Sequence, residues 1–119
     1  MTFTEFQELN ARRSRETWQH DVSNSGQDSP WPWQNWALCV AGEAGELCNL
    51  TKKVLRGDFP LTDAKADLLR ELADIITYAD LMISSLNAST ENVVLSKFRE
   101  VSHRLGWTDD GHASCLPDL

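Results

Sequence analysis

The sequence of 119 residues has few cysteines and no long apolar run. Cys39, Cys48 and Cys115 form no C-x-x-C pair, and an odd number of cysteines does not suit a disulfide framework. No apolar stretch approaches the roughly 18 to 20 residues that cross a bilayer, and Met1 leads directly into polar sequence rather than a signal region. We therefore expect a cytoplasmic protein with reduced thiols and no membrane contact.

Basic residues are also scarce. Eleven Lys and Arg residues stand against 18 Asp and Glu residues, which gives a net charge of −7. A nucleic acid polymer is excluded as the expected partner, because binding it requires a basic surface that neutralises phosphates. A small anion that carries a divalent metal remains compatible with this charge.

Strand patterns are almost absent, and helical periodicity covers most of the chain. The periodicity predicts helices over 3–20, 34–56 and 63–87 and a fourth that opens at Ser89 and closes at Gly106. Short connections between the last three helices favour antiparallel neighbours. The expected fold is a single all-α domain over 1–119, a bundle of four to five helices with an irregular tail at 107–119.

Local signals set the expected ends of these helices. Gly57 followed by Pro60 predicts the end of the second helix, and Thr62 is the predicted N-cap of the third. The third helix carries an apolar stripe that includes Leu72 and Ile76, and we expect this stripe to face the core.

Two acidic pairs border the apolar stripes of the second and third helices. Glu43 and Glu46 form one pair, and Glu71 and Asp74 form the other. The i, i+3 spacing points both members of a pair the same way, and a rise of about 1.5 Å per residue puts the pairs at matching heights in an antiparallel hairpin. Four facing carboxylates repel each other unless cations neutralise them, and oxygen ligands suit Mg²⁺ or Mn²⁺. The pattern therefore predicts a metal site.

The alternative is that these acids are ordinary surface charges that pair with Lys52, Lys53 and Arg70. Of the two lysines, only Lys53 shares the face of Glu46, so we expect Lys52 to be exposed to solvent. Gly45 also needs an explanation, since Gly in a helix costs about 1 kcal/mol relative to Ala. We expect it to accommodate a close helix contact or a ligand.

The motifs resemble a known family. The string from Trp36 to Lys53, the string from Glu71 to Leu81, and Lys97 to Ser102 resemble the MazG-like all-α nucleoside triphosphate pyrophosphohydrolases, whose signature is E-x-x-E followed after a gap by E-x-x-D. The gap here is 24 residues, and the resemblance covers about residues 34–105.

This resemblance implies Mg²⁺-dependent hydrolysis of a (deoxy)nucleoside triphosphate to the monophosphate and pyrophosphate, for nucleotide-pool control or house-cleaning, by a homodimer or a dimer of dimers. It implies Glu43, Glu46, Glu71 and Asp74 as metal ligands. Either Glu43 or Glu46 is the candidate general base, and the choice between them is open.

The resemblance also implies phosphate contacts at Lys53, Tyr78 and Lys97. Relatives carry K-F-N where this chain has Lys97-Phe98-Arg99, so the family's amide contact is replaced by Arg99, which can hold a phosphate bidentately. Pyrimidine deoxynucleotides are the first expectation for the substrate, because similar small members act on them. The related phosphoribosyl-ATP pyrophosphohydrolases are the alternative within this class.

Tryptophans are abundant, and three of the five cluster around the start of the predicted helix over 34–56, just ahead of Glu43. Trp31, Trp33 and Trp36 could stack on a nucleobase, while core packing or a dimer interface would explain them equally well. His20 is a candidate for a hydrogen bond to a base edge, and the alternative is a surface or capping residue.

Two other classes of protein fit parts of the pattern. A di-iron carboxylate bundle needs two Glu-x-x-His pairs, and Glu100 with His103 supplies only one. A non-catalytic helical interaction module would use its acids only to keep an oligomer soluble. We assign no function to His103 or His112.

Overall fold

The computed structural model describes residues 1–108, and this part of the chain is all-helical, with no strand. The elements are α1 (Phe3–Arg13), one π-helical turn η1 (Ser14–Trp18), α2 (Gln34–Leu55), α3 (Leu61–Ser85) and α4 (Thr90–Arg104). The expected all-α class is confirmed. Residues 109–119, with His112, Cys115 and most of the expected tail, lie outside the described residues.

The ends of α1 and η1 are set by side chains and by one left-handed residue. Thr2 and Glu5 form a capping box, in which the Glu5 amide donates to Thr2 Oγ1 (3.1 Å) and the Thr2 amide donates to Glu5 Oε2 (2.6 Å). Gln19 has a φ of 60°, so the helical run stops at Trp18. The predicted helix over 3–20 was therefore two residues too long.

Gly57 and Pro60 shape the turn between α2 and α3. Gly57 has a φ of 80° and ends α2, as predicted. The predicted N-cap at Thr62 is wrong, because α3 already begins at Leu61. The Pro60 carbonyl accepts from the amides of Asp63 (3.1 Å) and Ala64 (3.4 Å), so Pro60 is itself the N-cap. At the other connection, Ser89 caps α4, and the fourth predicted helix is confirmed.

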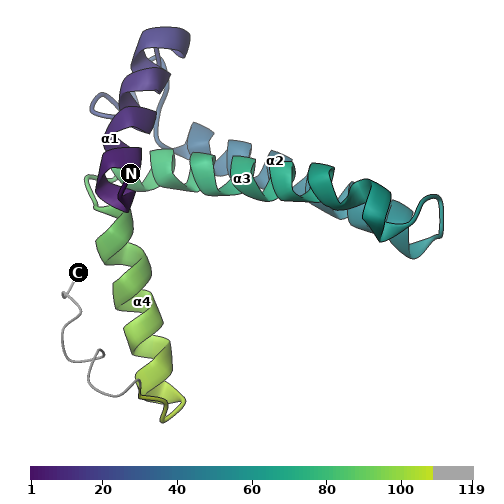
Figure 1. Cartoon of the computed structure of the whole chain (residues 1–119). Helices are drawn as coiled ribbons and strands as arrows, with labels where there is room; N and C mark the ends of the chain where they lie inside the picture. The colour runs from purple at the N-terminus through teal and green to yellow at the C-terminus, as the bar shows by residue number, and fades with distance from the viewer. Residues whose placement is uncertain (109–119) are drawn as a thin grey trace.

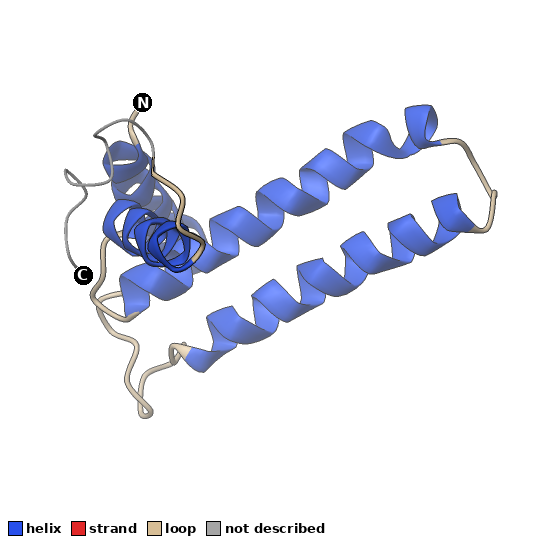
Figure 2. Cartoon of the chain, turned by 90° about the horizontal axis from the view of Figure 1, so that it is seen from below, coloured by secondary structure: helices blue, strands red, loops and turns tan. Residues whose placement is uncertain are grey.

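The elements form a T. α2 and α3 run side by side in an antiparallel hairpin (Figure 2), and α1 and α4 lie across the C-terminal end of α3, pointing in opposite directions (Figure 1). The radius of gyration is 17.2 Å. A compact domain of this length would have a radius of about 13 to 14 Å. The helices therefore meet in pairs and do not close around one central core.

A polar joint fixes α1 and α4 to α3. Asp80 is 1% exposed; its Oδ2 accepts from Asn10 Nδ2 (2.8 Å), and its Oδ1 accepts from the Thr90 hydroxyl (2.5 Å). Asn10 Nδ2 also donates to the Thr77 carbonyl (3.0 Å). Gln7 adds bonds from α1 to the C-terminal end of α3 and to the start of α4. Side-chain hydrogen bonds thus hold the three helices at one point.

Few apolar side chains are fully buried. Within residues 1–108, only Trp36, Ala64 and Leu81 are buried hydrophobic residues. Leu72 is 42% exposed and Ile76 is 56% exposed, so the expectation that the whole stripe of α3 faces the core is wrong for these two. The reason is geometric, since α2 covers only one side of α3 and leaves the remainder of its apolar face uncovered.

Candidate metal centre and aromatic cluster

The α2–α3 hairpin brings three of the four predicted ligands together. One carboxylate oxygen from each of Glu43, Glu46 and Glu71 lies within 4.8 Å of the other two. We call these residues the acidic triad. Asp74 is not a member of this group, although its negative charge acts on Glu71. The matching heights predicted from helix geometry are thus observed for the triad.

Glu71 shows the strain of this arrangement. Its pKa is raised, first because protonated Glu71 can donate a hydrogen bond to Glu43, then because of burial, and then because of the negative charge of Glu43. Glu46 acts in the opposite direction, and Asp74 adds to the increase. Glu71 Oε2 is buried and has no hydrogen-bond partner among residues 1–108. The triad therefore needs a proton or a cation.

Basic side chains do not satisfy the triad. In the described part of the chain, Arg70 pairs with Asp67 (2.8 Å) instead, and no ion pair involves Glu43, Glu46 or Glu71. Lys52 is exposed, as predicted. The expected pairing of these acids with Lys52, Lys53 and Arg70 is therefore not observed within residues 1–108.

A surface hollow of about 300 Å³ lies beside the triad. Glu46 and Glu71 line it together with Lys53 and Arg70. Lys53 therefore lies on the same side of the hairpin as the acids, as its spacing from Glu46 predicted. Carboxylates and basic side chains thus line the same open hollow, and this combination suits a ligand that carries both phosphate groups and a metal ion.

Tyr78 and Cys39 lie next to the triad on its other side. Burial raises the pKa of Tyr78, and coulombic interactions with Cys39, Glu43 and Asp74 raise it further. Burial also raises the pKa of the Cys39 thiol, again with a contribution from Glu43. Both groups therefore stay protonated at neutral pH, and Tyr78 remains a hydrogen-bond donor. Cys39 and Cys48 are free thiols, as expected.

Aromatic rings gather beside Tyr78. Trp18, His20, Trp31, Trp36 and Tyr78 form what we call the aromatic cluster. His20 stacks on Trp31 with ring centroids 3.6 Å apart and an interplanar angle of 12°. Trp18 stacks on Tyr78 with ring centroids 6.2 Å apart. The ring of Trp36, which is 1% exposed, also lies 6.2 Å from the ring of Tyr78.

Several polar atoms of this cluster have no partner. His20 Nδ1, Trp31 Nε1 and Trp36 Nε1 are buried without a hydrogen bond to any residue that the structure describes. Burial lowers the pKa of His20, so the imidazole is neutral at neutral pH. Trp33 is 40% exposed and makes no ring contact with the cluster. Three of the four predicted base-contacting residues are thus assembled, and Trp33 is not.

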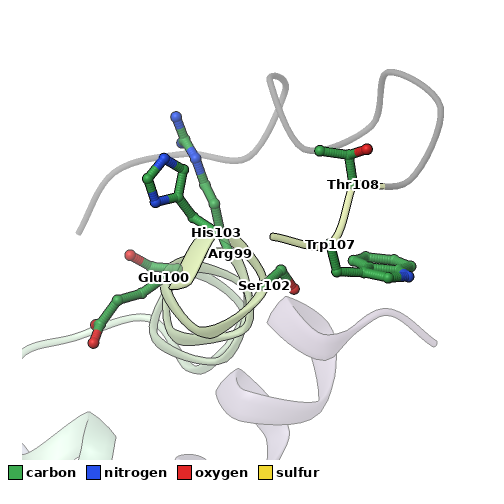
Figure 3. Close-up of a pocket in the computed structure, with 7 residues that line it drawn as sticks. Arg99, Glu100, Ser102, His103, Trp107 and Thr108 are labelled. Atoms are coloured by element: carbon green, nitrogen blue, oxygen red, sulfur yellow. The ribbon is translucent and has the colours of Figure 1, made fainter. Parts of the chain in front are cut away.

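The predicted phosphate contacts on α4 lie elsewhere. Lys97 pairs with Glu100 on the same helix (2.7 Å). Arg99 lines a separate hollow of about 480 Å³ near the end of α4, where it lies beside His103 and away from Trp107 (Figure 3). Glu100 and His103 do not join any metal-binding group within residues 1–108, so the structure adds no support for a di-iron centre.

Some neighbours of the site were missed by sequence reasoning. Trp18, the last residue of η1, stacks on Tyr78, and Arg13 acts on Tyr78 from α1, which is distant in sequence. Cys39 was expected only to be a reduced thiol, although its spacing of four residues from Glu43 could have placed it on the same face. Gly45 has open space where a Cβ would lie, so the expected close helix contact is not found within residues 1–108, and the expected ligand stays a prediction.

Comparison of the chain with protein-family models, with curated proteins and with solved structures finds no match. The resemblance to the MazG-like family therefore depends on the motif residues themselves. No helix within residues 1–108 is long and apolar enough to span a bilayer.

Proposed function

We propose that this protein is a MazG-like pyrophosphohydrolase that converts a (deoxy)nucleoside triphosphate of the cytoplasmic pool to the monophosphate and pyrophosphate. The observation that carries the proposal is the acidic triad, whose oxygens from two helices lie within 4.8 Å of one another and form no ion pair with any described residue. The raised pKa of Glu71 supports it, because such a cluster is stabilised by a cation.

The triad fits magnesium. Its donors are all carboxylate oxygens, which hard Mg²⁺ or Mn²⁺ prefers, and the partnerless Glu71 Oε2 offers a further acceptor. Glu43, Glu46 and Glu71 would hold the ion, and Asp74 lies close enough to act electrostatically on Glu71. When bound, magnesium would offset the triphosphate charge and lower the pKa of a water molecule.

The neighbouring residues supply the remaining parts of the reaction. Glu43 or Glu46 accepts a proton from the attacking water, which adds to phosphorus while the bond to the pyrophosphate oxygen breaks. Lys53 in the adjoining hollow offsets charge on the leaving pyrophosphate. Tyr78 keeps its proton and donates a hydrogen bond to a phosphate oxygen.

The aromatic cluster is the proposed base site. Trp36 is seven residues before Glu43 on α2, or about 10 Å along the helix, so a nucleotide can reach from one site to the other. The cluster offers flat rings for stacking and polar ring nitrogens without partners. Pyrimidine deoxynucleotides remain the first expectation, with phosphoribosyl-ATP as the alternative substrate.

Lys97 and Arg99 would serve a second copy of the chain. Glu71 is fourteen residues before the end of α3, or about 21 Å along the axis, and α4 then turns away from the hairpin (Figure 1). These two residues therefore cannot reach the triad of their own chain. In the proposed homodimer or homotetramer they contact phosphates bound by a neighbouring protomer.

The test is pyrophosphate release from a panel of canonical and modified triphosphates with Mg²⁺ or Mn²⁺. We expect activity in the wild type and a loss of at least about a hundredfold in Glu43→Gln and Glu71→Gln, since each removes a charged ligand. Glu8→Gln is the matched control, because Glu8 is an exposed acid on α1 outside the triad. Wild-type turnover in both triad variants, with helical circular dichroism intact, would refute the assignment.

A second candidate is the non-catalytic helical interaction module. The exposed apolar residues of α3 and the large radius of gyration favour it, because both indicate a surface that binds another helix. Magnesium with a non-hydrolysable triphosphate separates the two candidates. It raises the Tm of a nucleotide-binding enzyme by mass action and leaves the Tm of a simple interaction module unchanged.

A further inference from the structure

Ser14 is the most completely enclosed polar residue of the N-terminal segment. It is 0% exposed and opens the π turn η1. Its hydroxyl donates to the His20 carbonyl (2.8 Å), and its own carbonyl accepts from the amides of Gln19 and His20, the latter at 3.3 Å. Ser14 thus forms hydrogen bonds with both the amide and the carbonyl of His20.

The π turn places Trp18 as well as His20. In an α-helix, Trp18 would lie roughly 40° further around the axis than Ser14, because four residues exceed one turn of 3.6. A π turn contains more residues per turn, so Trp18 lies further back around the axis than it would in a continuous α-helix. There Trp18 stacks on Tyr78.

The backbone after this turn needs support. Gln19 has a φ of 60°, a left-handed backbone conformation that residues other than glycine rarely adopt. Such a conformation persists only where the surroundings hold it. The three hydrogen bonds of Ser14 to Gln19 and His20 supply that support, and they direct the imidazole onto Trp31.

We propose that Ser14 is a positioning residue, whose hydroxyl and carbonyl fix the His20 backbone so that the imidazole forms one wall of the base site. The assignment of the aromatic cluster to the base rests on the proposed function. The placement of His20 by Ser14 does not, because it follows from the hydrogen bonds and ring contacts alone.

The first experiment measures this placement without substrate. In proton–carbon NMR spectra, the His20 Hε1 signal, assigned by its loss in His20→Gln, is shifted upfield by the ring current of Trp31. Ser14→Ala removes the hydroxyl bond to the His20 carbonyl and moves this signal downfield, towards its free-chain position. Ser25→Ala is the matched control, since Ser25 is also a buried serine whose hydroxyl donates to a backbone carbonyl, that of Val22 (2.7 Å).

The second experiment separates base recognition from phosphate chemistry. With the preferred triphosphate, Ser14→Ala raises KM about five- to tenfold, the effect of one lost hydrogen bond, while kcat changes less than about twofold. Inhibition by inorganic tripolyphosphate, which has no base, stays at its wild-type strength. Ser14→Cys preserves the volume with a weaker donor and gives an intermediate KM, so it serves if Ser14→Ala does not fold.

The outcomes distinguish the two proposals. A His20 signal in Ser14→Ala that matches the signal in Ser25→Ala overturns the positioning role. Equal losses of kcat and of tripolyphosphate inhibition also overturn it, because they indicate a general structural defect. If the wild type hydrolyses no triphosphate, the proposed function fails, and the NMR comparison still decides the role of Ser14.

Discussion

At the scale of single residues, the acidic triad is held together by the fold and not by its own interactions. Glu43, Glu46 and Glu71 are brought together by the α2–α3 hairpin, and their carboxylates repel one another. The raised pKa of Glu71 is the measurable sign of this repulsion. The protein is therefore expected to lose stability when the triad ionises without a cation.

We predict that Glu71→Gln stabilises the metal-free protein increasingly as the pH rises. The folded-state pKa of Glu71 lies above its ordinary value of 4.5. The favourable contribution of the protonated carboxyl is thus complete below that ordinary value and is lost as the pH rises through the folded-state pKa. Melting curves between about pH 4 and pH 8 should show Tm of the variant rising relative to the wild type.

Magnesium and a matched variant check this prediction. Saturating Mg²⁺ should reverse the order of the two Tm values near neutral pH, because only the wild type retains all three ligands. Glu8→Gln should show no pH-dependent difference of this kind. A Tm difference between Glu71→Gln and wild type that does not change with pH would contradict the prediction.

The residues of the candidate site could be predicted from the sequence where helix geometry alone decides which side chains meet. The triad and Lys53 followed from spacing on two antiparallel helices. The roles of Ser14 and Trp18 did not follow, because a π turn leaves no simple spacing signal and displaces each later side chain around the axis. Arg13 near Tyr78 depends on how α1 crosses α3, which local sequence does not determine.

At the scale of elements, caps and turns explain most helix boundaries. Gly57 and Gly106 have φ values of 80° and 69°, and they end α2 and α4 at the positions that their residue type indicates. α3 began two residues earlier than expected, because Pro60 adopted the capping role assigned to Thr62. Periodicity was therefore enough to predict that each helix exists. The exact helix ends depended on which of several neighbouring residues caps the helix.

Gly45 gives a prediction for α2. A Cβ at this position would meet no atom within 4 Å, so Gly45→Ala should raise the free energy of unfolding by about 1 kcal/mol through helix propensity alone. Chemical denaturation at low protein concentration measures this change. A loss of stability in Gly45→Ala would mean instead that another chain packs closely against Gly45.

At the scale of the whole molecule, the T shape leaves apolar surface uncovered. Leu69, Leu72 and Ile76 lie on one side of α3, at exposures of 56%, 42% and 56%. Periodicity showed that this side is apolar but could not show whether the same chain covers it. Four helices led us to expect a closed bundle. In the observed T shape, only another chain could cover the exposed apolar side of α3.

We predict that a second copy covers this side of α3 and that Ile76→Glu disrupts the assembly. A charge at the centre of a desolvated interface costs several kcal/mol, so the dissociation constant should rise by at least about a hundredfold. Sedimentation velocity across a concentration series measures this. Leu55→Glu is the matched control, because Leu55 is 83% exposed at the tip of the hairpin, and its assembly should resemble wild type. Unchanged sedimentation of Ile76→Glu would refute this interface.

The polar joint at Asp80 also sets an order of events during synthesis. Asn10 and Asp80 are separated by 70 positions, and the bond from the Thr90 amide to Gln7 spans 83. α1 therefore leaves the ribosome long before its partners exist, whereas α2 and α3 follow each other directly and can pair as a hairpin at once. Docking of the first-made helix is thus a late step, and a nascent chain released before Thr77 would carry α1 without any of these partners.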